Sequence, residues 1–593
     1  MKYRITTLAV ASALAAMTTS AQGADFEIAG GTLNVGGSVV LGTALRSENP
    51  DPALLPPLNA KLIGLTGTAV YGSNVSDGDL NFSRWSQVSS VLKGNFNANY
   101  TQQNYGVMLS AKAWSDFALS NQDRPWGNLA NDYDAGAPLS DAGFAARAKF
   151  SGIDLNYLFA YGEHDIGDGK LEWKVGQQNW SWGREFQTGG GMNDLMVRDY
   201  NAMLRPGVLP EEVIVPVPAL HAIYTLASGA NVEAFVQTSF RPNAIFGCGT
   251  FYSQADFVSS GCNQIVVGGT LFSNPQALAT GYAVSRAPDV MPSNSVQGGV
   301  GIHQDFAAID STLGLYLAQY DSRQYFYGVY KATRAAPFAP NNPGNGNSQY
   351  TLEYPGGIKM IGITFDKELS AGNILAELTY RPDQPYHYNA LDMLNAFNSN
   401  TNASALRANA TATAPGALFN GYQDMKALQL NLSASRIVPK VLGAESISIA
   451  GEVGIKMTPG LPDPSVMRFG RAIDFGNAPL GNAACAAGLT PVECTNAGYD
   501  TKSAWGYRVR MSLNYPQLFG GVDFRPSISF AQDVKGWSDD GVFNQGRYLA
   551  NVDLKAVIKK SFSIDLTWMP TWGGDFNPLS DRSTVALSGA YKF

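Results

Sequence analysis

The chain has little charge for its length. Only 15% of its 593 residues are Asp, Glu, Lys or Arg, against roughly 25% in ordinary soluble domains. After the first twenty residues it also lacks any apolar run of the roughly 18 residues that a membrane-spanning helix needs. The missing runs exclude a helical membrane protein. The apolar content of 45% excludes intrinsic disorder, which combines low hydrophobicity with high charge.

Positive charge is not in excess either. The formal net charge is −7, whereas nucleic-acid-binding domains carry basic patches or a high isoelectric point. We therefore expect no nucleic-acid partner.

Groups for catalysis are also scarce, and neither a GxSxG nor an HExxH motif occurs. The four histidines, none of which stands near a Ser or acid in a recognisable catalytic pattern, are His164, His221, His303 and His387. We predict that the protein is not an enzyme and holds no cofactor or metal. An outer-membrane lipase or protease is the alternative, and it requires activity that depends on one of these histidines.

What replaces the charge is glycine and aromatic residues, with 63 Gly, 27 Tyr, 29 Phe and 10 Trp. This composition is compatible with a large soluble β protein or with a membrane β-barrel. The first residues favour export, because basic Lys2 and Arg4 precede an apolar run that ends in small residues before Ala24. Residues 1–23 are therefore predicted to be a cleaved signal peptide, and residues 24–593 the mature protein.

Past the signal peptide, side chains alternate with a period of two. In residues 503–515, Trp505, Val509 and Leu513 share one parity, while Arg508 and Arg510 take the other. Such alternation indicates strands with one apolar and one polar face. We predict eighteen strands, uncertain by two either way: 31–46, 84–101, 104–118, 154–165, 170–182, 219–228, 230–241, 295–307, 310–323, 356–369, 371–382, 422–438, 444–457, 501–515, 522–535, 545–559, 562–572 and 582–593.

The connections between these strands alternate between long and short. A meander with long loops on one side and tight turns on the other is typical of bacterial outer-membrane barrels. The fold class is therefore predicted to be all-β, an antiparallel transmembrane β-barrel of about 18 strands with short periplasmic turns and long extracellular loops. Localisation in the outer membrane of a Gram-negative bacterium follows, with outer-membrane lipids and lipopolysaccharide as surroundings.

The last strand ends at an aromatic carboxyl terminus. Tyr591 and Phe593 share a parity two residues apart. This arrangement resembles the C-terminal signal that the barrel-insertion machinery of Gram-negative bacteria reads, so that machinery is a predicted partner during biogenesis.

The four cysteines fall into two local pairs within long loops, Cys248 with Cys262 and Cys485 with Cys494. In an exported protein this predicts two disulfides. A zinc site is the alternative, although neither pair has CxxC spacing.

Several motifs are more specific than the alternation. They are Ser181-Trp-Gly, Leu204-Arg-Pro-Gly207, Pro216-Val-Pro218, Cys248-Gly-Thr-Phe-Tyr-Ser with Asp256, Glu353-Tyr-Pro-Gly-Gly-Ile358 and Tyr380-Arg-Pro-Asp-Gln-Pro385. Over the whole mature chain they resemble the proteobacterial outer-membrane family called domain of unknown function thirteen-oh-two. The resemblance implies a β-barrel that moves hydrophobic compounds or lipids across the envelope. It also implies two partners, a second exported protein and an inner-membrane exporter of the resistance-nodulation-division type, and it brings no catalytic residues.

Residues 183–218 form an unusually apolar loop, and contiguous exposed apolar surface normally marks an interaction site. The run Gly189-Gly190-Gly191 permits a sharp backbone reversal. We predict that the segment folds into the lumen as a constriction or plug; a self-packed extracellular cap is the alternative. The residues predicted to anchor it or to line the substrate path are Trp180, Trp182, Glu185, Asp199, Arg205, Glu211 and Glu212.

Two further features bear on transport. Residues 389–398 carry Leu391, Leu394 and Phe397 at helical spacing, which predicts either a surface helix that captures apolar substrate or a helix packed on the barrel rim. The inner parity of the late strands carries acidic residues and the predicted lumen cations Arg508, Arg510, Arg525, Arg547 and Lys555. These charges either tune selectivity or pair with one another.

The sequence thus predicts an outer-membrane channel or transporter that passes hydrophobic compounds or lipids. A general porin for small polar solutes is the alternative. An adhesin or purely structural barrel is a third, weaker hypothesis.

Overall fold

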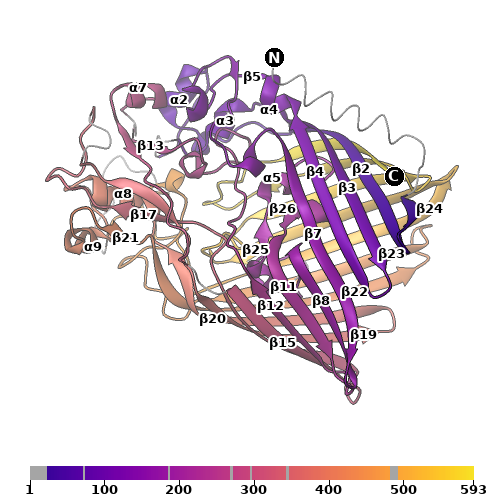
Figure 1. Cartoon of the computed structure of the whole chain (residues 1–593). Helices are drawn as coiled ribbons and strands as arrows, with labels where there is room; N and C mark the ends of the chain where they lie inside the picture. The colour runs from indigo at the N-terminus through magenta and orange to yellow at the C-terminus, as the bar shows by residue number, and fades with distance from the viewer. Residues whose placement is uncertain are drawn as a thin grey trace.

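The protein is built around one closed β-barrel. A computed structural model describes residues 23–70, 74–184, 187–267, 271–293, 297–341, 346–480 and 492–593, so residues 1–22 of the predicted signal peptide lie outside the described part. The main sheet has 20 strands; two of these, β1 and β28, are short additions, which leaves eighteen antiparallel strands in the wall (Figure 1).

The wall strands follow one another around the ring in chain order. They are β2 (Gly31–Arg46), β3 (Gln87–Gln102), β4 (Tyr105–Asp116), β7 (Ser151–Ile166), β8 (Gly169–Gln178), β11 (Val217–Thr225), β12 (Asn231–Gln237), β15 (Gln297–Phe306), β16 (Ser311–Tyr320), β19 (Ile358–Leu369), β20 (Gly372–His387), β22 (Tyr422–Pro439), β23 (Ser446–Met457), β24 (Ser503–Phe519), β25 (Val522–Lys535), β26 (Tyr548–Ile558), β27 (Phe562–Met569) and β29 (Thr584–Lys592). The predicted fold class and strand number are confirmed.

The ring closes where the first wall strand pairs with the last. Strand β2 runs antiparallel to β29 over residues 38–46. Beyond the end of β29, the backbone of Phe593 exchanges two hydrogen bonds with Gly37, of 2.8 and 3.0 Å. The loop end of this seam holds a buried ion network, in which Arg46 lies 3.0 Å from Asp79 and 2.6 Å from Asp581.

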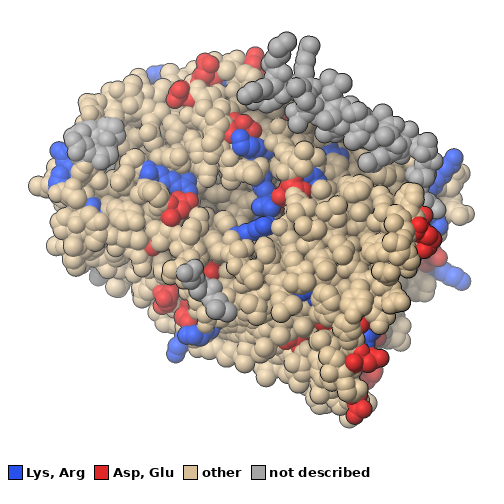
Figure 2. Space-filling view, viewed as in Figure 1, with Lys and Arg blue, Asp and Glu red and all other residues tan. Residues whose placement is uncertain are grey.

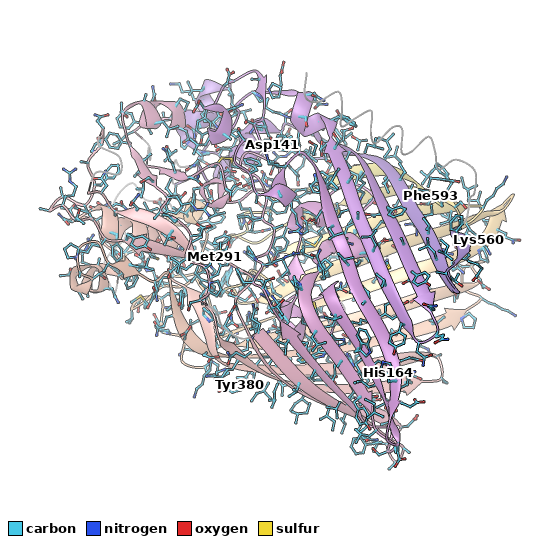
Figure 3. All side chains as sticks on the ribbon, viewed as in Figure 1. Asp141, His164, Met291, Tyr380, Lys560 and Phe593 are labelled. Atoms are coloured by element: carbon cyan, nitrogen blue, oxygen red, sulfur yellow. A yellow bond between two sulfur atoms is a disulfide. The ribbon has the colours of Figure 1, made fainter. Side chains whose placement is uncertain are left out.

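Connections alternate as the sequence predicts. The eight turns at one end have two to six residues each, whereas all nine loops at the other end are longer, up to the 59 residues between β12 and β15. Figure 3 labels His164 near a turn tip and Met291 within the loops at the opposite end.

The outer surface of the wall is an apolar belt. Along β16, Leu313, Leu315 and Leu317 are exposed while the alternate residues Tyr316 and Ala318 are buried. A period of two puts alternate side chains on opposite faces of a sheet, and in a membrane barrel the apolar parity faces lipid. On the face seen in Figure 2, the wall between the turns and the cap is nearly free of Lys, Arg, Asp and Glu.

The long loops fold into a cap with its own core. Tyr327, Tyr350, Leu352 and Phe397 pack together there, and the predicted Cys248–Cys262 disulfide is present. Cys485 lies outside the described residues, so its pairing with Cys494 stays a prediction. Short strands outside the wall are β1 (Ala24–Ile28), β5 (Asp123–Arg124), β6 (Ala137–Pro138), β9 (Val197–Arg198), β10 (Ile214–Val215), β13 (Gln264–Val266), β14 (Ala283–Ser285), β17 (Phe326–Tyr330), β18 (Gln349–Glu353), β21 (Leu418–Phe419) and β28 (Thr571–Trp572).

Helical pieces lie in the loops. They are α2 (Pro57–Leu62), α3 (Asp77–Asn81), α4 (Phe117–Asn121), α5 (Tyr200–Met203), α6 (Pro210–Val213), α7 (Asn274–Ala279), α8 (Ala390–Asn398), α9 (Arg407–Ala412) and the 3₁₀ turns η1 (Pro52–Leu54), η2 (Leu129–Asn131), η3 (Ala146–Ala148), η4 (Gly191–Leu195), η5 (Asp256–Val258) and η6 (Ile473–Phe475). None of the helices in the described ranges is long and apolar enough to cross a membrane.

Three details correct the sequence analysis. The predicted strand 170–182 ends early, because β8 stops at Gln178 and the chain turns inward. Strand β1, which pairs with the start of β2, was not predicted. The predicted helix at 389–398 exists as α8, but Leu391, Leu394 and Phe397 are buried in the cap core. These side chains therefore do not form an exposed surface for capturing substrate.

Candidate functional site: a chain segment across the barrel lumen

One long connection leaves the wall altogether. Strands β8 and β11 are already paired at Gln178 and Val217, so the intervening residues 179–216 are not needed to close the barrel. We call residues 179–216 the lumen segment. It contains η4, β9, α5, α6 and β10.

One part of the segment binds the wall around β19 to β23. The carboxylate of Glu377 on β20 accepts backbone N–H bonds from Arg184 and Met192, at 2.6 and 2.7 Å. On β23, Glu452 accepts the N–H of Thr188 at 2.6 Å. Other contacts to this wall are Arg184 to Asp366, Gln429 to the Gly189 carbonyl, Arg381 to the Gly191 carbonyl and Arg381 to Asp194.

A later part binds the facing wall. Lys93 of β3 forms an ion pair with Glu212 at 2.5 Å, and Lys112 of β4 lies 3.3 Å from Asp199. If β2 is counted as the first wall strand, β3 is the second and β20 is the eleventh. Two strands nine places apart in a ring of eighteen lie opposite each other. The lumen segment therefore crosses the barrel interior from wall to wall.

Glycines let the segment approach the wall closely. Gly190 and Gly191 have φ values of 86° and 63°, a region that favours glycine. A Cβ on Gly190 would lie 2.3 Å from the Gln429 amide oxygen, and one on Gly191 equally close to a Glu377 oxygen. The predicted backbone reversal thus occurs against β20 and β22.

Two of the predicted anchors are aromatic. Trp180 and Trp182 are buried and pack on Phe235 of β12, with ring centroids 4.3 and 5.0 Å apart. Trp182 also lies 5.1 Å from Tyr316 of β16. Their contacts join the start of the segment to an apolar part of the inner wall.

The remaining anchors have different partners. Asp199 also caps α5 by accepting the Ala202 N–H at 3.0 Å. Arg205 stacks over Trp114 at 4.6 Å, and Glu211 offers its carbonyl to Asn156 at 3.1 Å. Glu185 lies outside the described residues.

The wall partners Glu377, Glu452, Lys93 and Lys112 were missed by sequence reasoning. Lys93 and Lys112 could have been found, because both stand on the polar parity of predicted strands. Their pairing with Glu212 and Asp199 carries no local signal, since it joins residues about a hundred positions apart.

The charges of the late strands mostly pair with one another. Arg508 and Arg547 both bind Asp533 at 2.7 Å. Lys555 lies 3.4 Å from Asp565, and Arg525 lies 3.6 Å from Asp523. Arg510 has no ion pair within the part of the chain that the structure describes.

Three of the four histidines make side-chain contacts with neighbouring residues. His221 lies 2.6 Å from Glu233 and stacks near Trp180, and His387 stacks on Phe326 in the cap. His164 packs edge-on against Tyr105. No His, Cys, Asp or Glu cluster suited to a metal ion occurs among the described residues.

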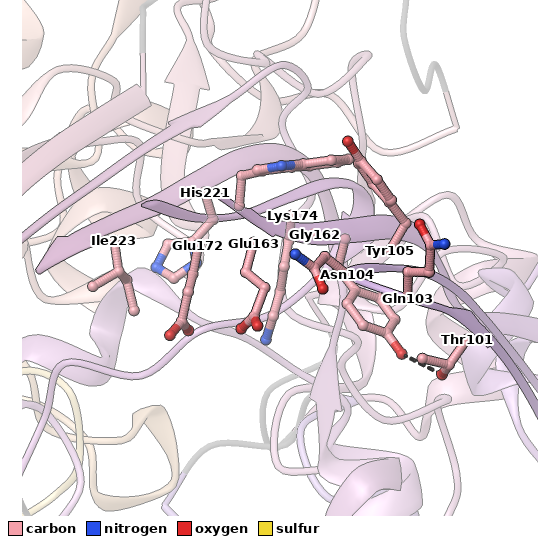
Figure 4. Close-up of a pocket in the computed structure, with 12 residues that line it drawn as sticks. Thr101, Gln103, Asn104, Tyr105, Gly162, Glu163, Glu172, Lys174, His221 and Ile223 are labelled. Atoms are coloured by element: carbon pink, nitrogen blue, oxygen red, sulfur yellow. Dashed lines mark hydrogen bonds between the residues drawn. The ribbon is translucent and has the colours of Figure 1, made fainter. Parts of the chain in front are cut away.

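A cavity of about 210 Å³ lies at the turn end of β3, β4, β7, β8 and β11 (Figure 4). Its charged lining residues include Glu163, Glu172 and Lys174. Nearby, Lys170 lies 2.5 Å from Glu163. This end of the barrel thus carries charged side chains beside aromatic ones, whereas the inner wall that contacts the tryptophans is apolar.

Several carboxyls buried in the cap have raised pKa values, among them Asp256, Asp474 and Glu353. Burial raises the pKa of Asp256 to about 6, although the Gly249 N–H opposes the shift. Burial likewise raises the pKa of Asp474 to about 7 and that of Glu353 to about 7. Each group holds its proton to a higher pH in the folded cap than in an unfolded chain, where the pKa is about 4.

We expect the cap to lose stability as the pH rises from about 4 to about 7, because the folded state binds more protons than the unfolded state over that window. Protease cleavage of the outer loops should be faster at pH 8 than at pH 5.5. Asp474→Asn and Glu353→Gln should flatten this dependence, and Asp463→Asn, at an exposed carboxyl, should not. An equal pH dependence in all three variants would contradict the assignment.

Solved structures with a similar fold are outer-membrane channels. They include the channel DcaP of Acinetobacter baumannii (9% identity, 96% of this chain and 100% of that chain, TM-score 0.34) and a BenF-like porin of Pseudomonas fluorescens (9%, 95% and 98%, TM-score 0.39). A third is OpdK of Pseudomonas aeruginosa with vanillate (10%, 94% and 98%, TM-score 0.36). Identities and scores this low carry no functional argument.

The comparison with curated proteins found no match. A family model does match, over residues 4–593, and its description is "Protein of unknown function (DUF1302)". This agrees with the resemblance seen in the sequence motifs. The chain belongs to the DUF1302 family.

Proposed function

We propose that the protein is an outer-membrane channel that passes hydrophobic compounds or lipids. The observation behind this proposal is that the inner wall is apolar where the lumen segment covers it. Phe235, Tyr316, Ala318 and Met360 face inward and pack with Trp182. The interior of a general porin is polar, whereas displacement of this segment would uncover an apolar strip.

Location and partners complete the proposal. Export by the signal peptide 1–23 and insertion guided by Tyr591 and Phe593 would place the barrel in the outer membrane. The barrel-insertion machinery would act during biogenesis, and an inner-membrane exporter with a second exported protein would act in transport. The family resemblance supports these last two partners.

Ligand retention and solute flux test the proposal together. Native mass spectrometry of the purified full chain should detect a bound long-chain compound, and liposomes containing the protein should not swell in sugar solutions. Met360→Gln places an amide on the apolar strip, and burial of such a group costs about 1–3 kcal/mol, so retention should fall roughly tenfold. Asn97→Gln, on the polar facing wall, is the control. Sugar flux at porin rates with no retained ligand would establish the polar-porin alternative.

A further inference from the structure

The barrel wall has a notch beside the loop end of β7. Over residues 151–162, β7 pairs with β4 along one edge. On its other edge, pairing with β8 begins only at Leu158 and continues toward the turn. Residues 151–157 therefore have a strand neighbour on one side alone, because β8 ends at Gln178 and the chain enters the lumen.

The next strands do not fill this notch. Strand β11 has nine residues and β12 has seven, against sixteen in β7. About 9–11 residues are needed to span a bilayer, and β12 is shorter than that, so the wall is low here. In Figure 1, β4 and β7 rise past the upper ends of β8, β11 and β12.

Side chains satisfy part of the free edge. The amide of Gln177 donates to the carbonyls of Leu155 and Asn156, at 2.5 and 3.0 Å. Arg241 holds that amide by donating to its oxygen at 3.0 Å, and donates to the Pro216 carbonyl at 2.8 Å. The base of the notch is thus fixed by side chains rather than by a strand.

Lipid-facing side chains border the notch. Ile153 is 71% exposed, and Leu155 and Leu158 on the same edge strand are exposed as well. Behind them lies the lumen segment, since Asn156 donates to the Glu211 carbonyl. An acyl chain lying along this strand edge would reach the lumen segment without passing the cap.

Three guanidinium groups gather at the notch. Arg205 donates to the Arg147 carbonyl at 3.3 Å. The pKa of Arg241 is lowered, mainly by burial and to a smaller extent by the nearby charge of Arg147. Arg147 is paired with Asp154 at 2.8 Å. Arg205 and Arg241 have no carboxylate within 4.0 Å in the described ranges. Figure 2 shows basic side chains gathered near the centre of the visible face, where the cap meets the long strands β4 and β7.

A guanidinium has five N–H donors in a fork that suits carboxylates. Arg241 uses two of its donors in the contacts above and Arg205 one. Asp154 is paired with Arg147. The carboxylates whose charges act on Arg205 are Asp199, Asp116 and Glu212, and each of them already has a partner of its own, in Lys112, Ser89 and Lys93. The site therefore has unused N–H donors on two guanidinium groups beside an apolar edge.

We propose that this notch is a lateral portal that binds a long-chain fatty acid from the membrane, with its carboxylate on Arg205 and Arg241 and its chain along Ile153 and Leu155. The proposal deepens the function above and rests on it, since it names the substrate class and the route. One carboxylate matches the unused donors of these guanidinium groups, and one exposed strand edge offers an apolar surface for the single chain of a fatty acid.

Photo-crosslinking tests the portal directly. The full chain in phospholipid vesicles is exposed to palmitate that carries a diazirine near the end of its chain, and labelled peptides are mapped. Labelling should concentrate on residues 151–158. Arg241→Gln and Arg205→Gln should each reduce the labelling roughly tenfold, since each variant loses a charge-assisted hydrogen bond to the carboxylate. Arg525→Gln, an exposed lumen arginine near the turns, should leave it unchanged.

Competition separates the possible outcomes. Unlabelled palmitate should suppress labelling, and hexadecanol should not. Equal suppression by hexadecanol, suppression by lipid A alone, or labelling spread evenly around the belt would overturn the proposal. Because the assay measures binding without flux, a labelled portal in a protein that passes only sugars would refute the proposed function and leave the portal standing.

Discussion

Replacing residues 179–216 by a four-residue turn is expected to raise the single-channel conductance of the barrel roughly threefold or more. Barrels of 16–18 strands leave an aqueous interior when nothing crosses it, and the lumen segment crosses this one. The cut is compatible with the fold, because Gln178 and Val217 are already paired neighbours that a short turn can join. Planar-bilayer recording of the refolded variant measures the effect.

Partial release of the segment should give an intermediate result. Glu377→Gln with Glu452→Gln removes two carboxylates that hold backbone N–H groups of the segment, so we expect flickering between low and high conductance. Glu368→Gln, at an exposed position near a turn of β19, is the matched control. Unchanged conductance after the full deletion would show that the segment does not restrict the pore.

Breaking the buried pair between Lys93 and Glu212 should destabilise the barrel strongly. Both side chains are at most 5% exposed, and removing one partner of a buried pair typically costs about 3–5 kcal/mol because the other charge is left uncompensated. Lys93→Met should therefore lower the temperature at which the barrel loses its heat-modifiable gel mobility. Adding Glu212→Gln to Lys93→Met should restore most of the lost stability, because it removes the uncompensated charge.

The molecule contains its own control for this experiment. Lys170 and Glu163 approach to the same 2.5 Å, but their side chains are 42% and 46% exposed. Exposed pairs contribute about 0–1 kcal/mol, so Lys170→Met should have little effect. If Lys93→Met and Lys170→Met lowered the stability of the barrel equally, burial would not be what determines the free-energy cost of breaking an ion pair.

Strand alternation carried most of the fold prediction, since a period of two along β16 or β24 is visible without a structure. It failed at Trp180 and Trp182. These residues continue the parity of Gln178, so the pattern reads as strand although the chain has left the wall. Alternation indicates which face of an extended chain a side chain lies on. It does not indicate whether that chain is paired with a neighbouring strand.

The contacts of the lumen segment could not be predicted from the sequence. The apolar composition of residues 183–218 led us to expect a segment folded into the lumen. In the structure, the lumen segment contacts the wall on both sides of the barrel interior. Its partners Glu377 and Lys93 stand on strands nine places apart, and no local pattern encodes a distance across a ring. For the same reason, the notch beside β7 appears only when the lengths of neighbouring strands are compared.

The seam between β2 and β29 has a consequence for assembly. Arg46 and Asp581 are 535 positions apart in the chain, and the entropy lost on closing a loop grows with its length. All other wall contacts join strands adjacent in sequence, so the sheet can grow hairpin by hairpin while its edges stay open. The ring can close only when β29 is in place, and the partly formed barrel exposes two unpaired edges until then.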